Sequence, residues 1–460
     1  MRIGEAHHEQ LREHLYPGDG LEAVALVLCG RTADRGREGV FVHHLEPIPY
    51  AECTVRSADE VRWSTARLPS LLARAARENL ALLKIHSHPG GYSQFSDRDD
   101  DSDRELFPGV YAWTDTERPH LSAIMLPDGS ITARVVQSDG AFVPVEQVAL
   151  TGRSIKLWPH DRCASPANIE VERVHKRTAQ AFGTGTTQVL RALCVAIIGC
   201  SGTGSWLVEL LSRLGVGRMI LVDPDVVEEV NLNRILHATK SHAQLRTHKV
   251  EVLRTAILQT GLSVDIETHA TELQSPDLLK RIAQCDVVFG CVDSLEARHI
   301  LGRLAQYYLI PYIDIGVRLQ ADGLGGVEQI VGSVNYVHAS SSTLLDRGLY
   351  DAKSLADEGL RRVDPRAFAD QVERGYIRGA NVERPAVASI NALFSSLAAT
   401  ELLARLHQFR DEEPEGVMLS LSQLRLIPTD LSHLAKLSAA RTGRGDVEPM
   451  LGLPSLSEKS

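Results

Sequence analysis

The 460-residue sequence is poor in cysteine, and its seven cysteines are scattered along the chain. They stand at positions 29, 53, 163, 194, 200, 285 and 291, and no two form a Cys-x-x-Cys pair. This scatter excludes a disulfide framework or a thiolate zinc knuckle as the basis of the fold, and it is typical of a reduced, cytoplasmic protein. The sequence also lacks an apolar run long enough to cross a bilayer, and Met1–Gln10 lacks the apolar core of a signal peptide. We therefore expect no membrane partner.

An excess of basic residues is missing as well. The formal net charge is −10, whereas a dedicated nucleic-acid binder needs a basic surface to neutralise phosphates. We expect no nucleic-acid partner, although a single nucleotide needs only one local pocket. The length is too great for one hydrophobic core and predicts two or three domains.

The apolar runs divide the chain into four parts. Residues 1–150 mix strand-like and helical stretches, and residues 151–170 form a polar stretch with two prolines that we interpret as a linker. Residues 171–428 show strands alternating with helices. Residues 429–460 are small and polar, and we expect a loosely ordered tail.

Only the second domain shows regular strand–helix alternation. Its expected elements are strands at Leu193–Ile198, Met219–Val222 and Val287–Phe289 and a helix over Ser205–Leu214. This alternation predicts an α/β domain with a parallel, doubly wound sheet. In the first domain we expect strands at Ala23–Cys29 and Leu82–His86, a helix near Thr65–Glu78 and a hairpin turn at Pro127–Gly129.

Two histidines, His86 and His88, stand at the end of an apolar strand. Side chains two apart on a strand share a face, so both imidazoles could reach one zinc ion. Ser96 resembles a helix N-cap, which places Asp99 in the first turn as a third ligand. Three protein ligands leave a position for water, as in catalytic zinc sites. The plainer alternative is a pair of strand histidines beside an acidic, solvated loop.

The spacing His-x-His, seven residues, Ser, two residues, Asp resembles the signature of the JAB/JAMM metalloproteases. The resemblance implies an N-terminal α/β domain of cytidine-deaminase-like fold with zinc isopeptidase or precursor-processing activity. It implies that the zinc ligands are His86, His88 and Asp99, and that Ser96 helps to stabilise the oxyanion.

A zinc peptidase also needs a carboxylate that passes a proton to the leaving amine. Glu22, which precedes the strand Ala23–Cys29, is our candidate. The family usually has glycine three residues after its glutamate, whereas this chain has Ala25. Glutamates 5, 9 and 13 are also in range, but they lie in a polar, helix-like stretch, so we prefer Glu22.

A glycine-rich turn follows the strand Leu193–Ile198. Gly199, Gly202 and Gly204 let backbone N–H groups approach a phosphate, and Asp223 ends the next strand, where it can bind ribose hydroxyls. The glycine spacing is not the Gly-x-Gly-x-x-Gly of nicotinamide dehydrogenases. A Walker-type loop is excluded because no Gly-Lys-Ser/Thr follows.

The stretch from Asp223 to Arg234 reads Asp-Pro-Asp-Val-Val-Glu-Glu-Val-Asn-Leu-Asn-Arg. It resembles the Asp-x-Asp-x-Val-x-x-x-Asn-Leu-x-Arg signature of ThiF-like and ubiquitin-activating adenylating enzymes. The resemblance spans roughly Val171 to Leu426 and implies a Rossmann-like, mainly parallel domain that binds ATP and Mg²⁺. The nucleotide-site residues that it implies are Asn231, Arg234, Lys249, a magnesium-associated Asp293, and an Arg177 that a homodimer partner often supplies.

The family pattern breaks at Thr343–Gly348. This stretch looks like a Cys-x-x-Cys-Arg-Gly knuckle with both cysteines replaced, so we expect no structural zinc there. No cysteine follows Cys291, which puts a thioester step in doubt, because that step needs a thiolate. Our hypothesis is an acyl-adenylate passed directly to a conjugating enzyme or another acceptor.

The two resemblances together imply a bifunctional enzyme of a ubiquitin-like modifier pathway. Its partner would be a small β-grasp protein, whose C-terminus one domain adenylates and whose precursor or conjugates the other cleaves. Fusions of this kind resemble bacterial modifier systems, some of them linked to phage defence. Three alternatives stay open: activation of a sulfur carrier for cofactor biosynthesis, modification of a peptide, and a non-catalytic scaffold that binds a modifier.

Overall fold

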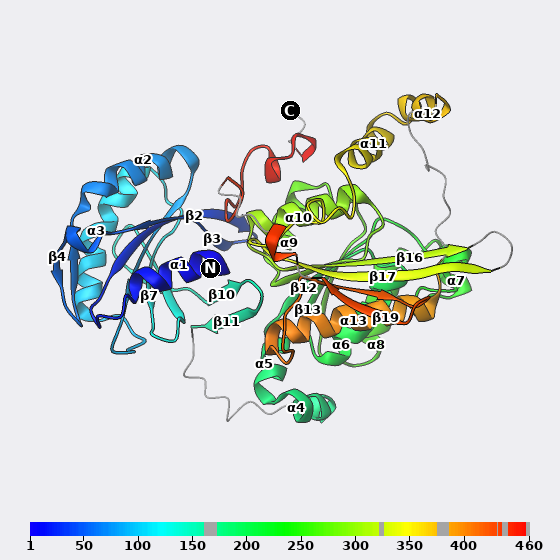
Figure 1. The fold of residues 1–460 in the computed structure, drawn as a ribbon, viewed down its shortest axis with the longest axis horizontal. Helices are drawn as coiled ribbons and strands as arrows, with labels where there is room; N and C mark the ends of the chain where they lie inside the picture. Colours follow the sequence, from blue (N-terminus) through cyan, green and yellow to red (C-terminus); the bar gives the residue numbers. More distant parts are fainter. Residues whose placement is uncertain (161–172, 322–325, 375–385, 430, 435–439, 457–460) are drawn as a thin grey trace. The chain divides into compact units, whose positions relative to one another are not determined.

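A computed structural model describes the chain except for residues 161–172, 322–325, 375–385, 430, 435–439 and 457–460 (Figure 1). The chain divides into two compact units. The first is Met1–Asn168 with Gln306–Leu309 and Leu437–Ser460, and the second is Ile169–Ala305 with Ile310–Lys436. Among the described helices, none combines the length and the apolar character that crossing a membrane requires.

The first unit is built on a nine-stranded mixed sheet in the order β11-β10-β1-β3-β2-β6-β7-β8-β9. Its strands are β1 (Arg2–Gly4), β2 (Val24–Asp34), β3 (Arg37–Pro47), β6 (Ala81–Ser87), β7 (His120–Met125), β8 (Ile131–Val136), β9 (Phe142–Pro144), β10 (Gln147–Thr151) and β11 (Ile155–Pro159). A separate ribbon pairs β4 (Cys53–Arg56) with β5 (Val61–Trp63). The helices are α1 (Glu5–Leu15), α2 (Leu68–Glu78) and α3 (Asp97–Thr114).

The β2 strand is central to this sheet and is buried on both faces. Its odd-numbered side chains, from Ala23 just before the strand to Cys29, join a core that includes Leu11 of α1. Its even-numbered side chains from Val24 to Leu28 join a second core, which includes Phe107 of α3. A strand covered on both faces reads as a continuous apolar run rather than an alternating one.

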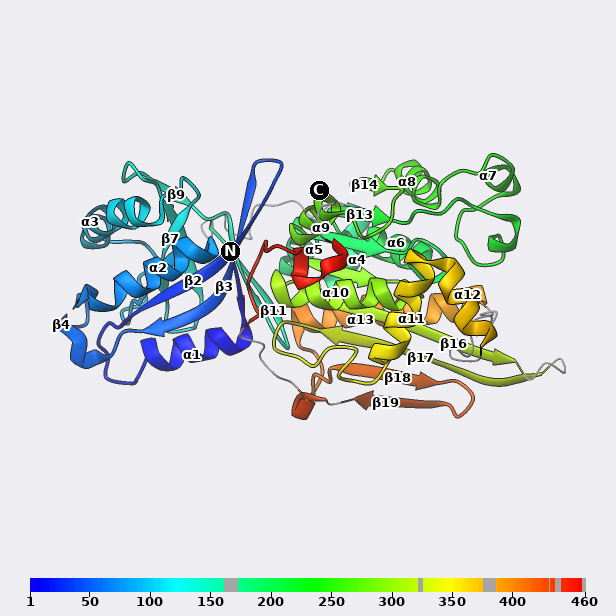
Figure 2. The same ribbon diagram turned by 90° about the horizontal axis from the view of Figure 1, so that it is seen from above.

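The second unit contains an eight-stranded sheet in the order β14-β13-β12-β15-β16-β17-β18-β19. Its strands are β12 (Cys194–Ile198), β13 (Arg218–Val222), β14 (Asp265–His269), β15 (Val287–Gly290), β16 (Tyr312–Ala321), β17 (Val327–Val337), β18 (Gly416–Ser420) and β19 (Arg425–Thr429). The first five strands of that order pair in parallel and the last three are antiparallel. Figure 2 shows β18 and β19 at the edge of the sheet.

The helices of the second unit are α4 (Lys176–Phe182), α5 (Thr184–Ala192), α6 (Gly202–Leu214), α7 (Lys240–Gln244), α8 (Lys249–Gln259), α9 (Pro276–Ala283), α10 (Leu295–Tyr307, whose last two residues belong to the first unit), α11 (Ala352–Val363), α12 (Pro365–Glu373) and α13 (Ala388–His407). The long α13 packs on α6, β16 and β17 (Figure 1). The chain leaves β12 in one direction, to β13 and β14, and later returns to the other side, to β15 and β16. The carboxyl ends of β12, β13 and β15 therefore flank a topological switch point, where open α/β sheets bind ligands.

The α/β fold class is confirmed in both units, and the expected strands and hairpin are present. The turn at Pro127–Gly129 joins β7 to β8, which pair antiparallel. The expected helix at Thr65–Glu78 is divided, because residues Thr65–Arg67 form a 3₁₀ turn and α2 starts at Leu68. Pro69 explains that start, since proline suits the first turn of a helix, where its missing N–H costs nothing.

Two boundary expectations differ from the structure. The stretch expected as a linker from residue 151 begins with β11, which pairs antiparallel with β10, so the first sheet continues to Pro159. The tail, expected to be loose from residue 429, begins on the last residue of β19, Thr429, and between residues 440 and 456 it contains the buried side chains of Thr442 and Leu451. Composition could not reveal this, because small residues suit close packing as well as disorder.

The C-terminal segment extends the first sheet. The N–H of Gly30 donates to the carbonyl of Gly443 at 3.0 Å, and the N–H of Asp446 donates to the carbonyl of Arg31 at 2.8 Å. A Cβ added to Gly443 would lie 1.9 Å from the Val42 carbonyl oxygen. Only glycine permits such a close approach of two backbones.

Candidate zinc centre and candidate nucleotide site

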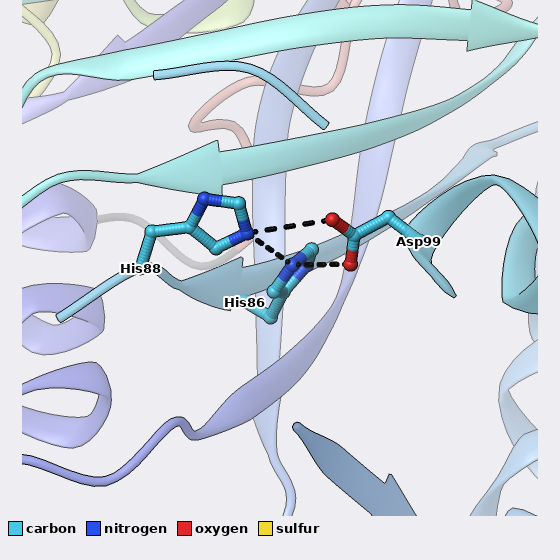
Figure 3. A group of neighbouring side chains, drawn as sticks. All are labelled: His86, His88 and Asp99. Atoms are coloured by element: carbon cyan, nitrogen blue, oxygen red, sulfur yellow. Dashed lines mark hydrogen bonds and ion pairs between the residues drawn. The ribbon is translucent and has the colours of Figure 1, made fainter. Parts of the chain in front are cut away.

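His86 lies within β6, and His88 follows it directly. The N–H of His88 donates to the carbonyl of Met125 at 3.0 Å, which holds the residue beside β7. The Nδ1 of His88 lies 2.7 Å from the carbonyl oxygen of Tyr92, so this nitrogen carries the proton. That hydrogen bond directs the lone pair of Nε2 toward His86 and Asp99 (Figure 3). A carbonyl on the far ring nitrogen is the usual support for a metal-binding histidine.

The N-terminus of α3 places Asp99. Ser96 is the N-cap, and its hydroxyl donates to Asp99 Oδ2 at 2.8 Å while accepting from the Asp99 N–H at 3.3 Å. The Ser96 N–H also donates to Asp99 Oδ2 at 2.7 Å, and this reciprocal capping box fixes the carboxylate at the N-terminus of α3. The structure therefore gives Ser96 a holding contact with Asp99, which the sequence interpretation did not include.

The three predicted ligands converge on one point. His86 Nε2 lies 3.0 Å from His88 Nε2 and 2.9 Å from Asp99 Oδ1, and His88 Nε2 lies 3.5 Å from Asp99 Oδ2 (Figure 3). Donors about 2.0–2.1 Å from a tetrahedral zinc lie about 3.3 Å apart, so the spacing fits the ion. These residues are the one described group of histidine, cysteine and carboxylate side chains with ligand atoms this close together.

The charge distribution of this cluster suits a cation. Burial alone would raise the pKa of Asp99, but hydrogen bonds with His86 and His88 hold it well below its usual value. Burial lowers the pKa of His86 and favours its neutral form, which is the form that binds metals. For His88 burial acts in the same direction, but the Asp99 carboxylate and the Tyr92 carbonyl outweigh it and raise the pKa.

Glu22 lies beside the cluster, on the residues that lead into β2. In the pairing of β2 with β6, Val24 stands opposite His86, and the N–H of Ala23 donates to the Ser87 hydroxyl at 2.9 Å. Glu22 is 6% exposed, and burial raises the pKa of its carboxyl to about 7, with a further contribution from Asp99. A carboxyl that titrates near neutrality can both accept and return a proton.

An ion-pair network that the sequence interpretation missed ties α3 to the sheet. Lys84 of β6 pairs with Asp103 at 2.5 Å, and Arg134 of β8 pairs with Asp103 at 2.6 Å and with Asp100 at 2.5 Å. The Arg134 guanidinium also lies 3.8 Å from the ring centre of Phe95. The i, i+3 spacing of the two aspartates was a usable signal, because it places them on one side of the helix.

The glycine-rich turn of the second unit has the tight backbone that its sequence predicts. Gly199 has φ +90°, and a Cβ on it would lie 2.5 Å from the Cys291 carbonyl oxygen. A Cβ on Gly204 would lie 1.9 Å from the Gly199 carbonyl oxygen. The turn therefore packs closely against the loop that carries Asp293, and Gly202 begins α6. An uncapped helix N-terminus at this point offers N–H groups to an anion.

Asp223 and Lys249 form a buried polar group beside this turn. One oxygen of Asp223 accepts from the Cys200 N–H at 2.7 Å and the other from the Asp225 N–H at 2.9 Å. Lys249 opens α8, and its ammonium lies 2.6 Å from Asp225 and 3.6 Å from Asp223. Burial raises the pKa of Asp223. Asp223 therefore fixes the glycine turn in addition to any contact with a ribose.

The Asn-Leu-Asn-Arg element lies next to the same turn. Asn231 is buried and its side-chain oxygen accepts from the Glu228 N–H at 3.1 Å. The side chain of Arg234 lies 3.5 Å from the position of a Cβ added to Gly202. Asn233 donates to the carbonyl of Ala386 at 3.2 Å, which joins this element to the residues before α13.

Arg177 is not brought to this group of residues. It lies exposed on α4, and its guanidinium donates to Gln180 of the same helix at 3.0 Å. Supply from a dimer partner stays a prediction.

The residues of the substituted knuckle hold their turn by hydrogen bonds. Thr343 donates from its hydroxyl to Asp346 Oδ2 at 2.7 Å, and the Asp346 N–H donates back to the Thr343 hydroxyl at 3.2 Å. Cys200 is fully buried and burial raises the pKa of its thiol well above the usual value. It is thus a packing residue rather than a nucleophile.

Comparison with known proteins finds relatives of this chain and a matching family for each of its two units. The chain is 31% identical to the adenylyltransferase and sulfurtransferase UBA4 of Meyerozyma guilliermondii, over 31% of this chain and 33% of that protein. It is 34% identical to the ubiquitin-like modifier-activating enzyme 5 of Caenorhabditis elegans, over 24% and 28%. The molybdopterin-synthase adenylyltransferase of Haemophilus influenzae is 33% identical over 29% and 54%. The chain spans about a third of the length of the first two relatives.

Among solved structures, that of E. coli MccB with ATP aligns at 15% identity and a TM-score of 0.43, over 57% of this chain and 72% of that chain. Residues 4–128 match the family of prokaryotic homologs of the JAB domain, and residues 175–442 match the ThiF family. The second match covers more than half of the sequence. The chain therefore belongs to the ThiF family and carries a JAB-type domain ahead of its ThiF domain.

Proposed function

We propose that this chain is a bifunctional enzyme of a ubiquitin-like modifier pathway. Its ThiF domain would use ATP and Mg²⁺ to adenylate the C-terminal carboxylate of a small β-grasp protein. Its JAB-type domain would cleave an isopeptide bond or a precursor of that protein. The observations that support the proposal are two features of one chain: the close group of candidate metal ligands His86, His88 and Asp99, and a glycine turn packed against the Asp293 loop.

The residues of the nucleotide site suit carboxylate adenylation. The modifier's carboxylate oxygen attacks the α-phosphorus, the bond to the β-phosphate breaks, and pyrophosphate leaves. Arg234 and Lys249 would offset the charge on the phosphates, and Asp293 would hold Mg²⁺. Lys249 would exchange its present partners, Asp225 and Asp223, for phosphate oxygens.

The residues of the zinc centre suit hydrolysis. Zinc bound to His86, His88 and Asp99 would supply a Lewis acid and an acidified water. Glu22 would take a proton and give it to the leaving amine, a role for which a pKa near 7 is well matched. Ser96 holds Asp99 in place through its hydroxyl.

The test is ATP–pyrophosphate exchange by the purified chain with each of a set of small β-grasp proteins. Exchange should require one candidate, be abolished by Asp293→Ala and survive His88→Ala. Cleavage of that candidate's precursor should instead be abolished by His88→Ala and survive Asp293→Ala. Exchange that occurs only with a sulfur carrier, or only with a short peptide, would mean that this molecule, and not a modifier protein, is the substrate of the ThiF domain.

A hydroxylamine-sensitive covalent adduct with the substrate would overturn direct transfer from the acyl-adenylate. No exchange with any candidate, and no stoichiometric zinc in the purified chain, would favour a scaffold that binds a modifier without catalysis.

A further inference from the structure

Asn391 has a buried amide nitrogen that no other described residue uses as a hydrogen-bond donor. It lies in the first turn of α13 and is 5% exposed. Its Nδ2 has no hydrogen-bond partner among the described residues. A buried donor without an acceptor is unfavourable, and an apolar side chain of similar shape would avoid that cost. The amide is therefore expected to meet an acceptor that the chain itself does not provide.

The orphaned amide points at the glycine turn. A Cβ added to Gly202, the first residue of α6, would lie 2.2 Å from Asn391 Nδ2. One turn further along α13, the Ser395 hydroxyl donates to the Thr203 carbonyl at 2.8 Å, which holds α13 against the same turn. The donor thus lies where the free N–H groups of the α6 N-terminus gather, and there is no room for a β-carbon between them.

We propose that Asn391 is a nucleotide-binding residue, whose Nδ2 donates a hydrogen bond to a phosphate oxygen of ATP at the glycine turn. The inference rests on the proposed function only in taking the ligand to be ATP. A neutral amide adds a donor without adding charge, so it complements the cations Arg234 and Lys249. The absence of a side chain at Gly202 is what lets the same oxygen reach both the amide and the helix N-terminus.

The test is calorimetric binding of Mg-ATP, AMP and adenosine to the full-length chain. Asn391→Ala should weaken ATP binding about tenfold, the usual effect of losing one hydrogen bond to a charged group. Asn391→Asp, which has nearly the same shape, should weaken it further, because a carboxylate repels phosphate. Adenosine should bind all forms alike. A loss shared by AMP assigns the contact to the α-phosphate, and a loss confined to ATP assigns it to the outer phosphates.

Ser396→Ala is the matched control, since Ser396 is exposed on the same helix and its hydroxyl only donates to the Ala392 carbonyl. The melting temperature of the ligand-free chain separates binding from folding. Removal of an orphaned donor should leave it unchanged or raise it, whereas a structural role would lower it.

Unchanged ATP affinity in Asn391→Ala, or equal weakening of adenosine, would overturn the proposal, as would a wild-type chain that binds no ATP. Intact ATP binding without pyrophosphate exchange would instead count against the proposed modifier activation and leave the role of Asn391 standing.

Discussion

At the scale of single residues, the candidate zinc centre depends on which side-chain atoms already make hydrogen bonds within the protein. The Nδ1 of His88 is held by the Tyr92 carbonyl, so only Nε2 is free to bind a metal. Asp99 is held by Ser96 from the other side. The backbone of Glu22 is held on both sides, since its N–H donates to the Ser57 carbonyl at 2.7 Å and its carbonyl accepts from Arg56 at 2.9 Å. Among the described residues these bonds hold Glu22 without using its carboxyl, which suits the proposed role in proton transfer.

Glu22→Gln should remove peptidase activity with little effect on zinc content. The amide is nearly isosteric but cannot accept the proton, and general acid–base catalysis contributes roughly 10²–10⁴-fold to rate. The measurement is the cleavage rate of a modifier precursor together with zinc per chain. Loss of activity in Glu13→Gln, with Glu22→Gln fully active, would assign the base to the earlier helix.

The raised pKa of Glu22 also predicts a pH effect on the stability of the zinc-free chain. Because its carboxyl titrates at about 7 when folded and near 4.5 when unfolded, the folded state binds more protons between these values. Stability attributable to Glu22 should therefore fall as pH rises from 4.5 to 7, by up to about 3 kcal/mol.

Urea unfolding of wild type and Glu22→Gln at pH 5 and pH 8 measures this difference. The variant should gain stability relative to wild type at pH 8 and not at pH 5. A difference in the free energy of unfolding between the two proteins that does not change with pH would contradict the raised pKa of Glu22.

Residue by residue, the sequence was informative wherever spacing alone determines geometry. The side chains of His86, His88 and Asp99 lie together in the structure because a strand, a turn and a helix cap fix their positions, and their role as zinc ligands stays a prediction. The orphaned amide of Asn391 could not be predicted, since α13 lies far along the chain and its contact with Gly202 is purely tertiary.

At the scale of elements, α3 is the part that must be aligned, because it carries Asp99 while the histidines come from β6. Its N-terminal turns are tied to the sheet by the network of Lys84, Asp100, Asp103 and Arg134. Asp103 is fully buried, so its charge needs both cations. Breaking a buried pair by removing one partner costs much more than the pair contributes.

Arg134→Met should lower the free energy of unfolding by about 3 kcal/mol and weaken zinc binding by about tenfold or more. Chemical denaturation and competition with a chromogenic chelator measure the two effects separately. Arg104→Met is the control. Arg104 also pairs with Asp100, but at 3.6 Å and with a half-exposed side chain, so its removal should change the free energy of unfolding and the zinc affinity little. Unchanged zinc affinity in Arg134→Met would mean that the network supports the fold without positioning Asp99.

Helices and strands were predictable where their apolar residues recur at a regular spacing because they face a hydrophobic core. The parallel strands β12, β13 and β15 are short, apolar and buried, and the sequence located each to within a residue or two. The antiparallel strands β18 and β19 were missed. β19 is exposed along most of its length, so no alternation of apolar and polar side chains marks it.

At the scale of the whole molecule, the chain holds its two candidate centres in different compact units. The candidate zinc ligands belong to the first unit, and the glycine turn, Lys249 and Asp293 belong to the second. A ligand that binds only the folded form of one unit stabilises that unit by mass action.

Zinc added to the metal-free chain at about 100 times its dissociation constant should stabilise the first unit by about 2.7 kcal/mol. Mg-ATP should stabilise the second unit instead. Scanning calorimetry of wild type, His88→Ala and Asp293→Ala checks this, since the first variant should lose only the zinc effect and the second only the ATP effect. A single transition that both ligands shift in both variants would contradict separate sites.

The C-terminal segment has a consequence for how the chain behaves in concentrated solution. β6 pairs with β2 only as far as Cys29, and beyond that point Gly443 and Gly445 cover the free side of β2. A chain cut before residue 440 would bare that stretch as an unprotected sheet edge, a ready template for pairing with another molecule. Proteolytic removal of these last residues should therefore make the protein self-associate, although every residue of both candidate centres would still be present.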